Sequence, residues 1–342
     1  APLIIRKAAR FEGLWRAAGG PLPGRFQLAG VPPKRGRFFA GKGVLDVMAY
    51  LFVMLSGCLW GCMGTIFKFL QPYGITSPQT AAYRMLIASI LAGLILLLRN
   101  RQAFRVSWRQ LFFLFLSGGV GSGIYNLTYF MAVEETAVSF AAAMSYTAPG
   151  FVTIFSIFLF HERLTRQKLC ALAMTLAGCV LVTGVLQSGG ASYSLYGILL
   201  GLAAGFFYAM YSLFLKKAIL AGCSGDSATF YCVLFPFVVV LPFSHLPQSF
   251  PALAEPRCLL LLLTLGCLCA AVPSALYSWG MTRVESGKAA MIATVDLVVS
   301  TILGVVLFRD PLSVLQIVGI LLILGAVATL SYQKPAKSAQ GA

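Results

Sequence analysis

The chain of 342 residues is 59% hydrophobic and 11% charged, with a mean hydropathy of +0.86. Soluble domains carry roughly 25% charged residues, and a single water-soluble core stops growing near roughly 250–300 residues. A soluble globular protein is therefore excluded, and the high hydrophobic content also excludes intrinsic disorder. The composition predicts a protein that crosses the lipid bilayer several times.

The net charge of +16 does not indicate a nucleic-acid partner, because the basic residues are not gathered on one face. Nine of them precede residue 43, and most of the others lie in short gaps between apolar runs. This distribution is typical of membrane topology signals. With two histidines and no Cys/His cluster at ligand spacing, we expect neither a metal site nor a cofactor.

The segment 1–44 is rich in Arg, Gly and Pro and contains no long apolar run. It lacks the apolar core of a secretory signal peptide. We expect a disordered basic tail, or translated sequence upstream of a true start at Met48, and we assign no function to it.

Ten apolar runs follow, each near the roughly 20 residues that cross a bilayer as a helix. Backbone polar groups cannot stay unpaired in lipid, so these runs are predicted to be helical. The expected spans are 45–70, 79–98, 110–131, 137–160, 167–186, 195–217, 227–243, 257–281, 287–308 and 312–332. The predicted fold class is an all-α polytopic membrane protein with ten transmembrane helices and a short tail, 333–342.

The basic residues of the connections alternate from gap to gap. With the N-terminus inside, the inner connections and the C-terminal tail hold thirteen Lys and Arg, whereas the outer gaps hold only Arg257 and Arg309. Positive residues accumulate on the cytoplasmic side of membrane proteins. We therefore expect both termini in the cytoplasm and a location in the plasma membrane, or in the inner membrane of a bacterium.

The two halves of the chain, 45–186 and 195–332, align without a gap at an offset of 148 residues. Matching pairs include Gly57 and Gly205, Lys68 and Lys216, Tyr83 and Tyr231, and Glu162 and Asp310. Each half holds five spans, an odd number, so the second half must be inverted relative to the first. Inverted repeats are typical of secondary transporters, whose substrate site lies near the midplane between the repeats.

The cavity is expected between spans one to four and six to nine. Spans five and ten have no charge in their middles and are expected at the periphery. Close-packing glycines also mark the first span of each half, at Gly57 and Gly61 and at Gly197, Gly201 and Gly205. Small residues at this spacing let helix backbones approach one another.

The stretch from Ser145 through Pro149 to Glu162 and Thr165 resembles the signature of the EamA family in the drug/metabolite transporter superfamily. The resemblance extends over about residues 48–332 and implies ten helices in two inverted five-helix repeats and transport of small metabolites, often outward. The second copy runs from Asp296-Leu297 to Asp310 and lacks the proline. We therefore expect no proline kink in the ninth span.

Asp296 is the foremost candidate for the substrate or proton pathway. It lies nine residues beyond Gly287, which is about 14 Å along a helix and near the midplane. A charge at this depth costs several kcal/mol and usually faces a cavity. Asp296 would bind a cationic group of the substrate or carry a coupling proton, unless a neighbouring base makes it a structural residue.

Other pathway candidates are basic, polar or aromatic. Lys68 and Arg84 lie near the outer ends of spans one and two, and we interpret both as side chains that snorkel to the headgroups, with a place in the pathway as the alternative. Asn126 offers neutral hydrogen bonding. Aromatic walls are expected from Tyr125, Tyr129, Tyr208, Tyr211 and Tyr277, although such residues also serve as packing or interface anchors.

The sequence has no phosphate-binding Gly-rich loop, and its two histidines support no Ser/His/Asp set, so neither ATP-driven pumping nor an enzyme is expected. We predict a secondary transporter, a monomer or homodimer, that moves small organic metabolites such as amino-acid-like amphiphiles by alternating access. A nucleotide-sugar carrier would require paired basic residues in the cavity. A membrane scaffold without transport would tolerate a neutral residue at position 296.

Overall fold

The computed structural model describes residues 39–136, 138–183, 186, 194–309 and 313–331. The predicted tail 1–44 falls outside this part up to residue 38, and the predicted tail 333–342 lies wholly outside it. The chain divides into two compact units, 1–48 and 49–342, and the residues that line the candidate site belong to the second. Helices joined by short connections account for the described residues, and no strand occurs among them.

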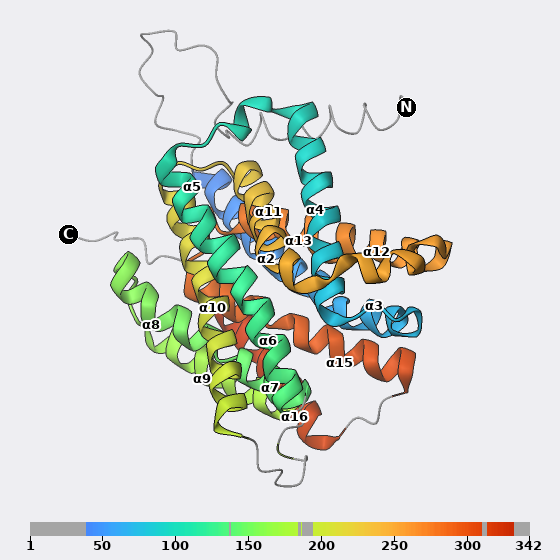
Figure 1. Cartoon of the computed structure of the whole chain (residues 1–342). Helices are drawn as coiled ribbons and strands as arrows, with labels where there is room; N and C mark the ends of the chain where they lie inside the picture. The colour runs from blue at the N-terminus through green and yellow to red at the C-terminus, as the bar shows by residue number, and fades with distance from the viewer. Residues whose placement is uncertain (1–38, 137, 184–185, 187–193, 310–312, 332–342) are drawn as a thin grey trace, which may run out of the picture. The chain divides into compact units, whose positions relative to one another are not determined.

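The helices follow the predicted spans closely. The first half consists of α2 (Phe39–Gly61), α3 (Met63–Leu70), η1 (Gln71–Tyr73), α4 (Ser77–Arg99), η2 (Arg101–Phe104), α5 (Trp108–Phe115), η3 (Leu116–Gly123), α6 (Ile124–Glu135), α7 (Val138–Ser145), α8 (Ala148–Phe160) and α9 (Arg166–Val182) (Figure 1). The second consists of α10 (Leu195–Leu220), α11 (Gly225–Ser244), η5 (Leu246–Ala254), α12 (Pro256–Gly266), η6 (Cys267–Ala271), α13 (Val272–Gly280), α14 (Ser286–Ala293), α15 (Val295–Phe308) and α16 (Val314–Ser331). Helix α2 begins six residues before the predicted span, because hydropathy marks the apolar part of a helix rather than its end.

Eight described helical segments are long and apolar enough to cross a membrane, and Val314–Leu330 is a shorter apolar helix. The remaining predicted span, the fifth, corresponds to α9, with 17 residues. The predicted fold class, an all-α membrane protein with five helices in each half, is confirmed.

The offset of 148 residues recurs in the helix caps. Thr165 and Ser313 are equivalent, and each hydroxyl oxygen accepts a hydrogen bond at 3.2 Å from the backbone N–H three residues later. His161 and Arg309 are also equivalent, and both adopt a left-handed conformation, with φ of 54° and 56°, at the C-terminal ends of α8 and α15. Because caps fix where a helix starts and stops, these equivalent residues begin and end the helices at equivalent positions in the two halves.

Spans four and nine are each broken at equivalent positions. Helices α7 and α8 are separated by Tyr146 and Thr147, and α14 and α15 by Thr294. The ninth span has no proline kink, as expected, but it is broken all the same at Thr294. At each break a threonine hydroxyl donates to the carbonyl oxygen three residues earlier, Thr147 to Met144 and Thr294 to Met291, both at 2.6 Å. Such back-bonding competes with the helical ladder and bends helices.

Gly57 of span one packs on the break in span nine, and Gly205 of span six packs on the break in span four. A β-carbon added at Gly57 would lie 2.7 Å from the carbonyl oxygen of Ala293, and one at Gly205 would lie 3.3 Å from the carbonyl oxygen of Ser145. Gly57 and Gly205 differ by 148 residues, and so do Ser145 and Ala293. The two contacts are therefore equivalent, and each joins one half of the chain to the other.

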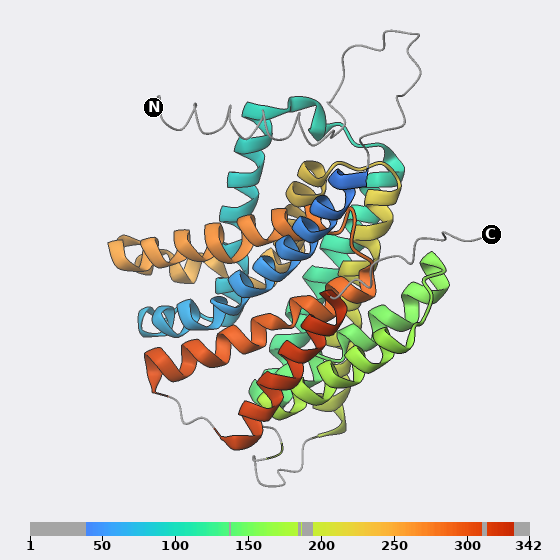
Figure 2. The ribbon, with the colours of Figure 1, turned by 180° about the vertical axis from the view of Figure 1, so that it is seen from behind.

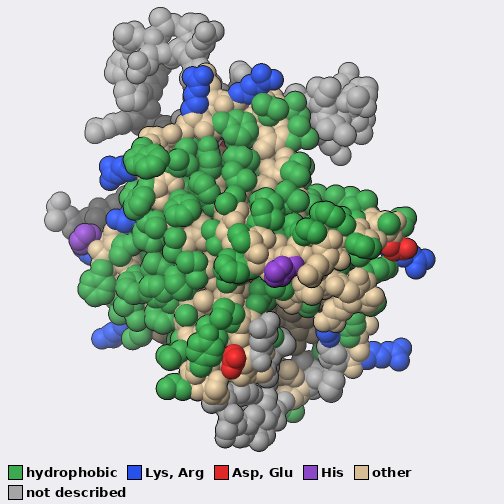
Figure 3. Space-filling view, viewed as in Figure 1, with side chains coloured by type: hydrophobic (Ala, Val, Ile, Leu, Met, Phe, Trp, Pro, Cys, Tyr) green, Lys and Arg blue, Asp and Glu red, His purple; other side chains and the backbone are tan. Residues whose placement is uncertain are grey.

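Spans five and ten lie side by side as α9 and α16 (Figure 2), and a β-carbon added at Gly178 would lie 2.8 Å from the carbonyl oxygen of Gly319. Large apolar side chains are exposed on the outer faces of the helices, including Leu98 and Phe158. Hydrophobic side chains cover most of the face in Figure 3, and Lys and Arg lie around its margin. This surface suits helices surrounded by lipid.

Candidate functional site

A cavity of about 420 Å³ lies between the two halves. Its walls come from α2, α3, α4, η3, α6 and α7 in the first half and from α10, α11, η6, α13 and α15 in the second. These helices are spans one to four and six to nine, and α9 and α16 contribute no residue to the lining. The expected position of the cavity is therefore confirmed.

Asp296 lines this cavity from the first turn of α15, directly after the break at Thr294. Its Oδ1 atom accepts a hydrogen bond from the Leu297 backbone N–H at 2.6 Å and one from the Tyr146 hydroxyl at 3.2 Å. The N-terminus of a helix carries a partial positive charge that stabilises an anion. The break in span nine thus creates a helix end at which a carboxylate can be held without a basic partner.

Tyr146 joins the two broken spans, because it lies at the break in span four and donates its hydrogen bond to Asp296 at the start of α15. Tyr146 is not among the pathway residues predicted from the sequence. A signal was present: Tyr146 belongs to the family-like stretch and precedes Thr294 by 148 residues.

The aromatic wall predicted from the sequence is largely present. Tyr125 and Tyr129 on α6 and Tyr208 and Tyr211 on α10 line the cavity, with the rings of Tyr125 and Tyr208 5.2 Å apart. Asn126 also lines it and donates a hydrogen bond to the Ser122 carbonyl oxygen at 2.7 Å. These side chains present mainly aromatic surface and hydroxyl groups.

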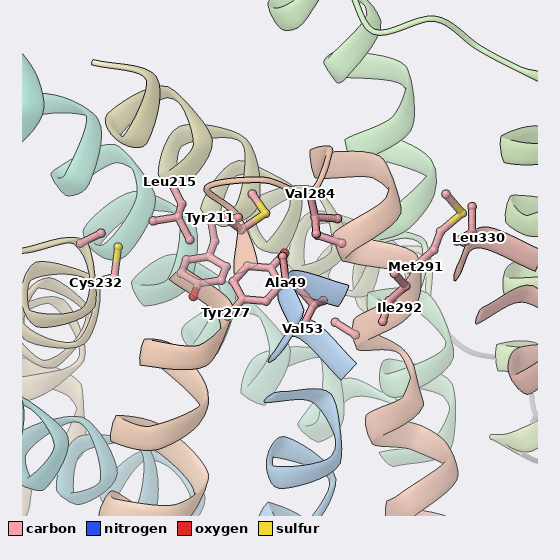
Figure 4. Close-up of a cluster of buried hydrophobic side chains, with 14 of the residues drawn as sticks. Ala49, Val53, Tyr211, Leu215, Cys232, Tyr277, Val284, Met291, Ile292 and Leu330 are labelled. Atoms are coloured by element: carbon pink, nitrogen blue, oxygen red, sulfur yellow. The ribbon is translucent and has the colours of Figure 1, made fainter. Parts of the chain in front are cut away.

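Tyr277 and Lys68 do not line the cavity. Tyr277 is 1% exposed, its hydroxyl pairs with that of Ser212 at 2.8 Å, and its ring stacks on Tyr211 within the hydrophobic core (Figure 4). Lys68 is exposed, and its Nζ atom lies 4.2 Å from the centre of the Phe308 ring. A cation over an aromatic ring near a helix end agrees with the snorkelling interpretation of Lys68.

Arg84 does not snorkel. Its side chain is 8% exposed and lines the cavity, and its Nη1 atom donates to the Met63 sulfur. It is the eighth residue of α4, about 10 Å from the helix start, and it shares a face with the buried Ala81 and Ala88. These small residues face the protein interior, so the arginine between them does too.

A polar network links the two halves where span four ends and span nine begins. Lys168 Nζ lies 3.1 Å from Glu162 Oε2 and 2.8 Å from Glu285 Oε2. Glu162 Oε1 accepts a hydrogen bond from the Ser286 backbone N–H at 3.2 Å. Burial raises the pKa of Glu285, but the hydrogen bonds and charges of Lys168 and Lys288 outweigh it and leave this pKa below its ordinary value. Glu162 therefore fixes the geometry of the connection that leads into α14 at Ser286.

Lys216 reinforces the same end of the molecule. Its Nζ atom donates to the carbonyl oxygens of Met281 at 2.6 Å and Val284 at 2.8 Å. Both bonds hold the connection between α13 and α14 against α10, so the helix ends on this side are tied together.

Comparison with known proteins identifies a family with this architecture. The model of the EamA-like transporter family matches residues 47–184 and, a second time, residues 195–332. The pseudopaline exporter CntI of Pseudomonas aeruginosa is 27% identical over 300 residues, which cover 85% of this chain and 99% of that protein. The uncharacterized transporter YetK of Bacillus subtilis is 23% identical over 72% of this chain and 76% of its own length.

A solved crystal structure matches with a TM-score of 0.70 at 22% identity, over 82% of this chain and 95% of that chain, which shows a shared fold. The family matches cover both halves of the chain and most of its length. The chain belongs to the EamA-like transporter family.

Proposed function

We propose that this membrane transporter is a secondary carrier that moves small organic metabolites, amino-acid-like molecules or related amphiphiles, outward across the plasma membrane by alternating access. Export is the activity named for the similar CntI protein. The cavity between two repeats with equivalent helix breaks supports this proposal, because secondary transporters bind substrate near such discontinuous helices.

The observation that supports this proposal most strongly is the position of Asp296, which lines the cavity at the N-terminus of the half-helix α15. No ion pair joins it to a base among the described residues, and its described partners are Tyr146 and Leu297. We propose that it carries the coupling proton or binds a cationic group of the substrate, since an acid held by neutral donors is free to change partner during transport.

The arrangement of the cavity supports an outward-facing state. With both termini in the cytoplasm, as we propose, the ends of α3, α4 and α6 that supply Phe67, Ser77 and Val133 to the lining lie on the outer side. The network around Lys168 and Lys216 closes the opposite, inner side. Inward opening would require these links to break while the outer ends of the same helices close.

The two alternative functions have less support. A nucleotide-sugar carrier needs paired basic residues for its phosphates, and Arg84 is the one basic side chain in the described lining. A scaffold without transport gives no reason for an acid and a base inside a cavity of about 420 Å³ in the membrane part of the chain, where charges cost several kcal/mol.

A metabolite-wide uptake screen in inverted vesicles tests the proposal. Vesicles that contain the protein are expected to accumulate particular metabolites when a proton gradient is present, and to accumulate less when it is collapsed. Vesicles without the protein supply the background. Equal uptake by both kinds of vesicle for every metabolite would refute the transport proposal and favour a scaffold.

A further inference from the structure

Building on the proposed transport function, we infer that Arg84 binds a carboxylate group of the transported molecule. The substrate class is thereby narrowed to organic acids that present one carboxylate to this side of the cavity.

The first observation is that Arg84 has almost no hydrogen-bonding partner. Its side chain is 8% exposed, its buried Nε atom has no partner, and Nη1 donates to the thioether sulfur of Met63 at 2.6 Å. A guanidinium has five N–H donors, and a thioether sulfur is a weak acceptor. A cation buried in this way is unfavourable unless an anion compensates it.

The second observation is that the described part of the chain supplies no such anion. Among the described residues no carboxylate lies within 4.0 Å of Arg84, and the described ion pairs join Lys168 and Lys288 to Glu162 and Glu285. Asp296 lines the same cavity but accepts its hydrogen bonds from Tyr146 and Leu297. With no compensating acceptor among the described residues, we take the carboxylate of the transported molecule as the group that fills this place.

The surroundings favour a single carboxylate. Arg84 is the one basic side chain and Asp296 the one acidic side chain in the described lining, and Tyr125 lines the cavity with them. The planar fork of arginine matches the two oxygens of a carboxylate. A diphosphate would require a second cation, and Lys68 lies instead over the Phe308 ring.

The test uses matched head groups on three different side chains. Phenylalanine, leucine and lysine are each compared with their amide and with the amine that lacks the carboxyl group. The measurement is the thermal unfolding midpoint of the purified full chain with each compound, for the wild type, Arg84→Gln, Arg84→Lys and Arg99→Gln. Arg99, the exposed last residue of the same helix, is the matched control.

For the wild type, the acids are expected to raise the midpoint more than their amides or amines do. Arg84→Gln is expected to weaken binding of the acids at least roughly tenfold, because one partner of a buried charge pair is lost. Arg84→Lys is expected to keep part of the preference, and Arg99→Gln all of it. Without ligand, Arg84→Gln is expected to be no less stable than the wild type, whereas removal of a structural arginine would lower the midpoint.

The assignment would be overturned if the amides and amines raised the wild-type midpoint as much as the acids do. It would also be overturned if no acid raised the midpoint, or if Arg84→Gln kept the preference for acids. The transport proposal is measured separately by gradient-dependent uptake in the vesicle screen. Uptake of amides and acids at equal rates would leave transport standing and remove the role of Arg84. Arg84-dependent binding of acids without uptake of any metabolite would support the role of Arg84 in binding and refute the transport proposal.

Discussion

At the residue scale, the hydrogen bond from Tyr146 to Asp296 is the contact that joins the two broken spans. Tyr146→Phe removes this donor and keeps the ring. We expect transport to slow roughly three- to tenfold, since a hydrogen bond contributes roughly 0.5–1.5 kcal/mol net. Initial rates of gradient-driven uptake measure the effect.

Tyr129→Phe is the matched control, because Tyr129 lines the same cavity and has no described hydrogen bond to Asp296. The two variants are expected to differ, with Tyr129→Phe closer to the wild type. Equal rates for Tyr146→Phe and the wild type would show that this bond has no part in transport.

The charged residues show how far sequence reasoning reaches at this scale. The depth of Asp296 along its span was sufficient to place it in the cavity. Arg84 was misplaced because its distance from the helix end was considered without its face, although Ala81 and Ala88 on the same face are small and buried. Tyr277 is a tyrosine like the residues of the cavity wall, but it lies in a second layer behind that wall, where it contacts Tyr211 and Ser212. Residue type alone cannot distinguish the two layers.

At the scale of elements, the contact between span one and the break in span nine depends on Gly61. A β-carbon there would overlap the Asp296 carbonyl oxygen and lie 2.8 Å from the Val299 β-carbon. Gly61→Ala is expected to lower the free energy of unfolding by roughly 1–3 kcal/mol, as overpacked cores do, and to reduce transport. Thermal unfolding midpoints and uptake rates measure both effects.

Gly64→Ala provides the comparison one turn further along. An added β-carbon at Gly64 has the Ser300 hydroxyl oxygen, 3.7 Å away, as its one close neighbour, which is an ordinary contact. Alanine is also the better helix former by roughly 1 kcal/mol. The variant is therefore expected to be as stable as the wild type, and equal losses at both positions would contradict a specific role for the close approach at Gly61.

The network around Lys168 joins α9 to the start of α14, and the Lys168 side chain is 5% exposed. Lys168→Met leaves Glu162 without its cation. Breaking a buried pair in this way is expected to destabilise the protein by roughly 3 kcal/mol or more, measured as a lower unfolding midpoint. Arg166→Met, at an exposed position on the same helix, is expected to change little. The opposite ranking would contradict a stabilising network.

The same network predicts a pH dependence. The pKa of Glu285 is lower in the folded protein than its ordinary value of 4.5, so its ionised form favours folding. This contribution is complete above about pH 4.5 and is lost as the pH falls further, through the folded-state pKa. Unfolding midpoints of the wild type are expected to fall in that range relative to Glu285→Gln, and parallel pH profiles would rule out a role for Glu285.

The helix breaks show what the sequence does not reveal about an element. The apolar run of span nine is continuous, so hydropathy predicts one helix from 287 to 308. The break at Thr294 arises from a hydroxyl that bonds back to Met291 and from close packing against Gly57. The second cause is tertiary and depends on a residue in the other half of the chain.

At the scale of the whole molecule, the proposed orientation in the membrane rests on the distribution of basic residues. Single cysteines at Ser188 or Gln248 are expected to react with a membrane-impermeant reagent added from outside. Cysteines at Gln102 or Ser338 are expected to remain unlabelled. Reaction at Gln102 from outside would reverse the proposed orientation and, with it, the assignment of the cavity as outward-facing.

Most of the architecture was predictable because the offset of 148 residues constrains both halves at once. The cavity between spans one to four and six to nine follows from the repeat and from the absence of charge in spans five and ten. The interlocking of each half with the broken span of the other was not predictable. It depends on which glycine faces which backbone, as at Gly205 and Ser145.

Asp296 is the group that we propose couples transport through the cavity to a gradient. The decisive measurement compares gradient-driven accumulation by wild type and Asp296→Asn in proteoliposomes, with substrate exchange measured in the same preparation. Asparagine keeps the shape of the side chain and cannot ionise. Accumulation is predicted to fall to the level of protein-free liposomes in the variant. Accumulation equal to that of the wild type, at equal amounts of inserted protein, would contradict the account.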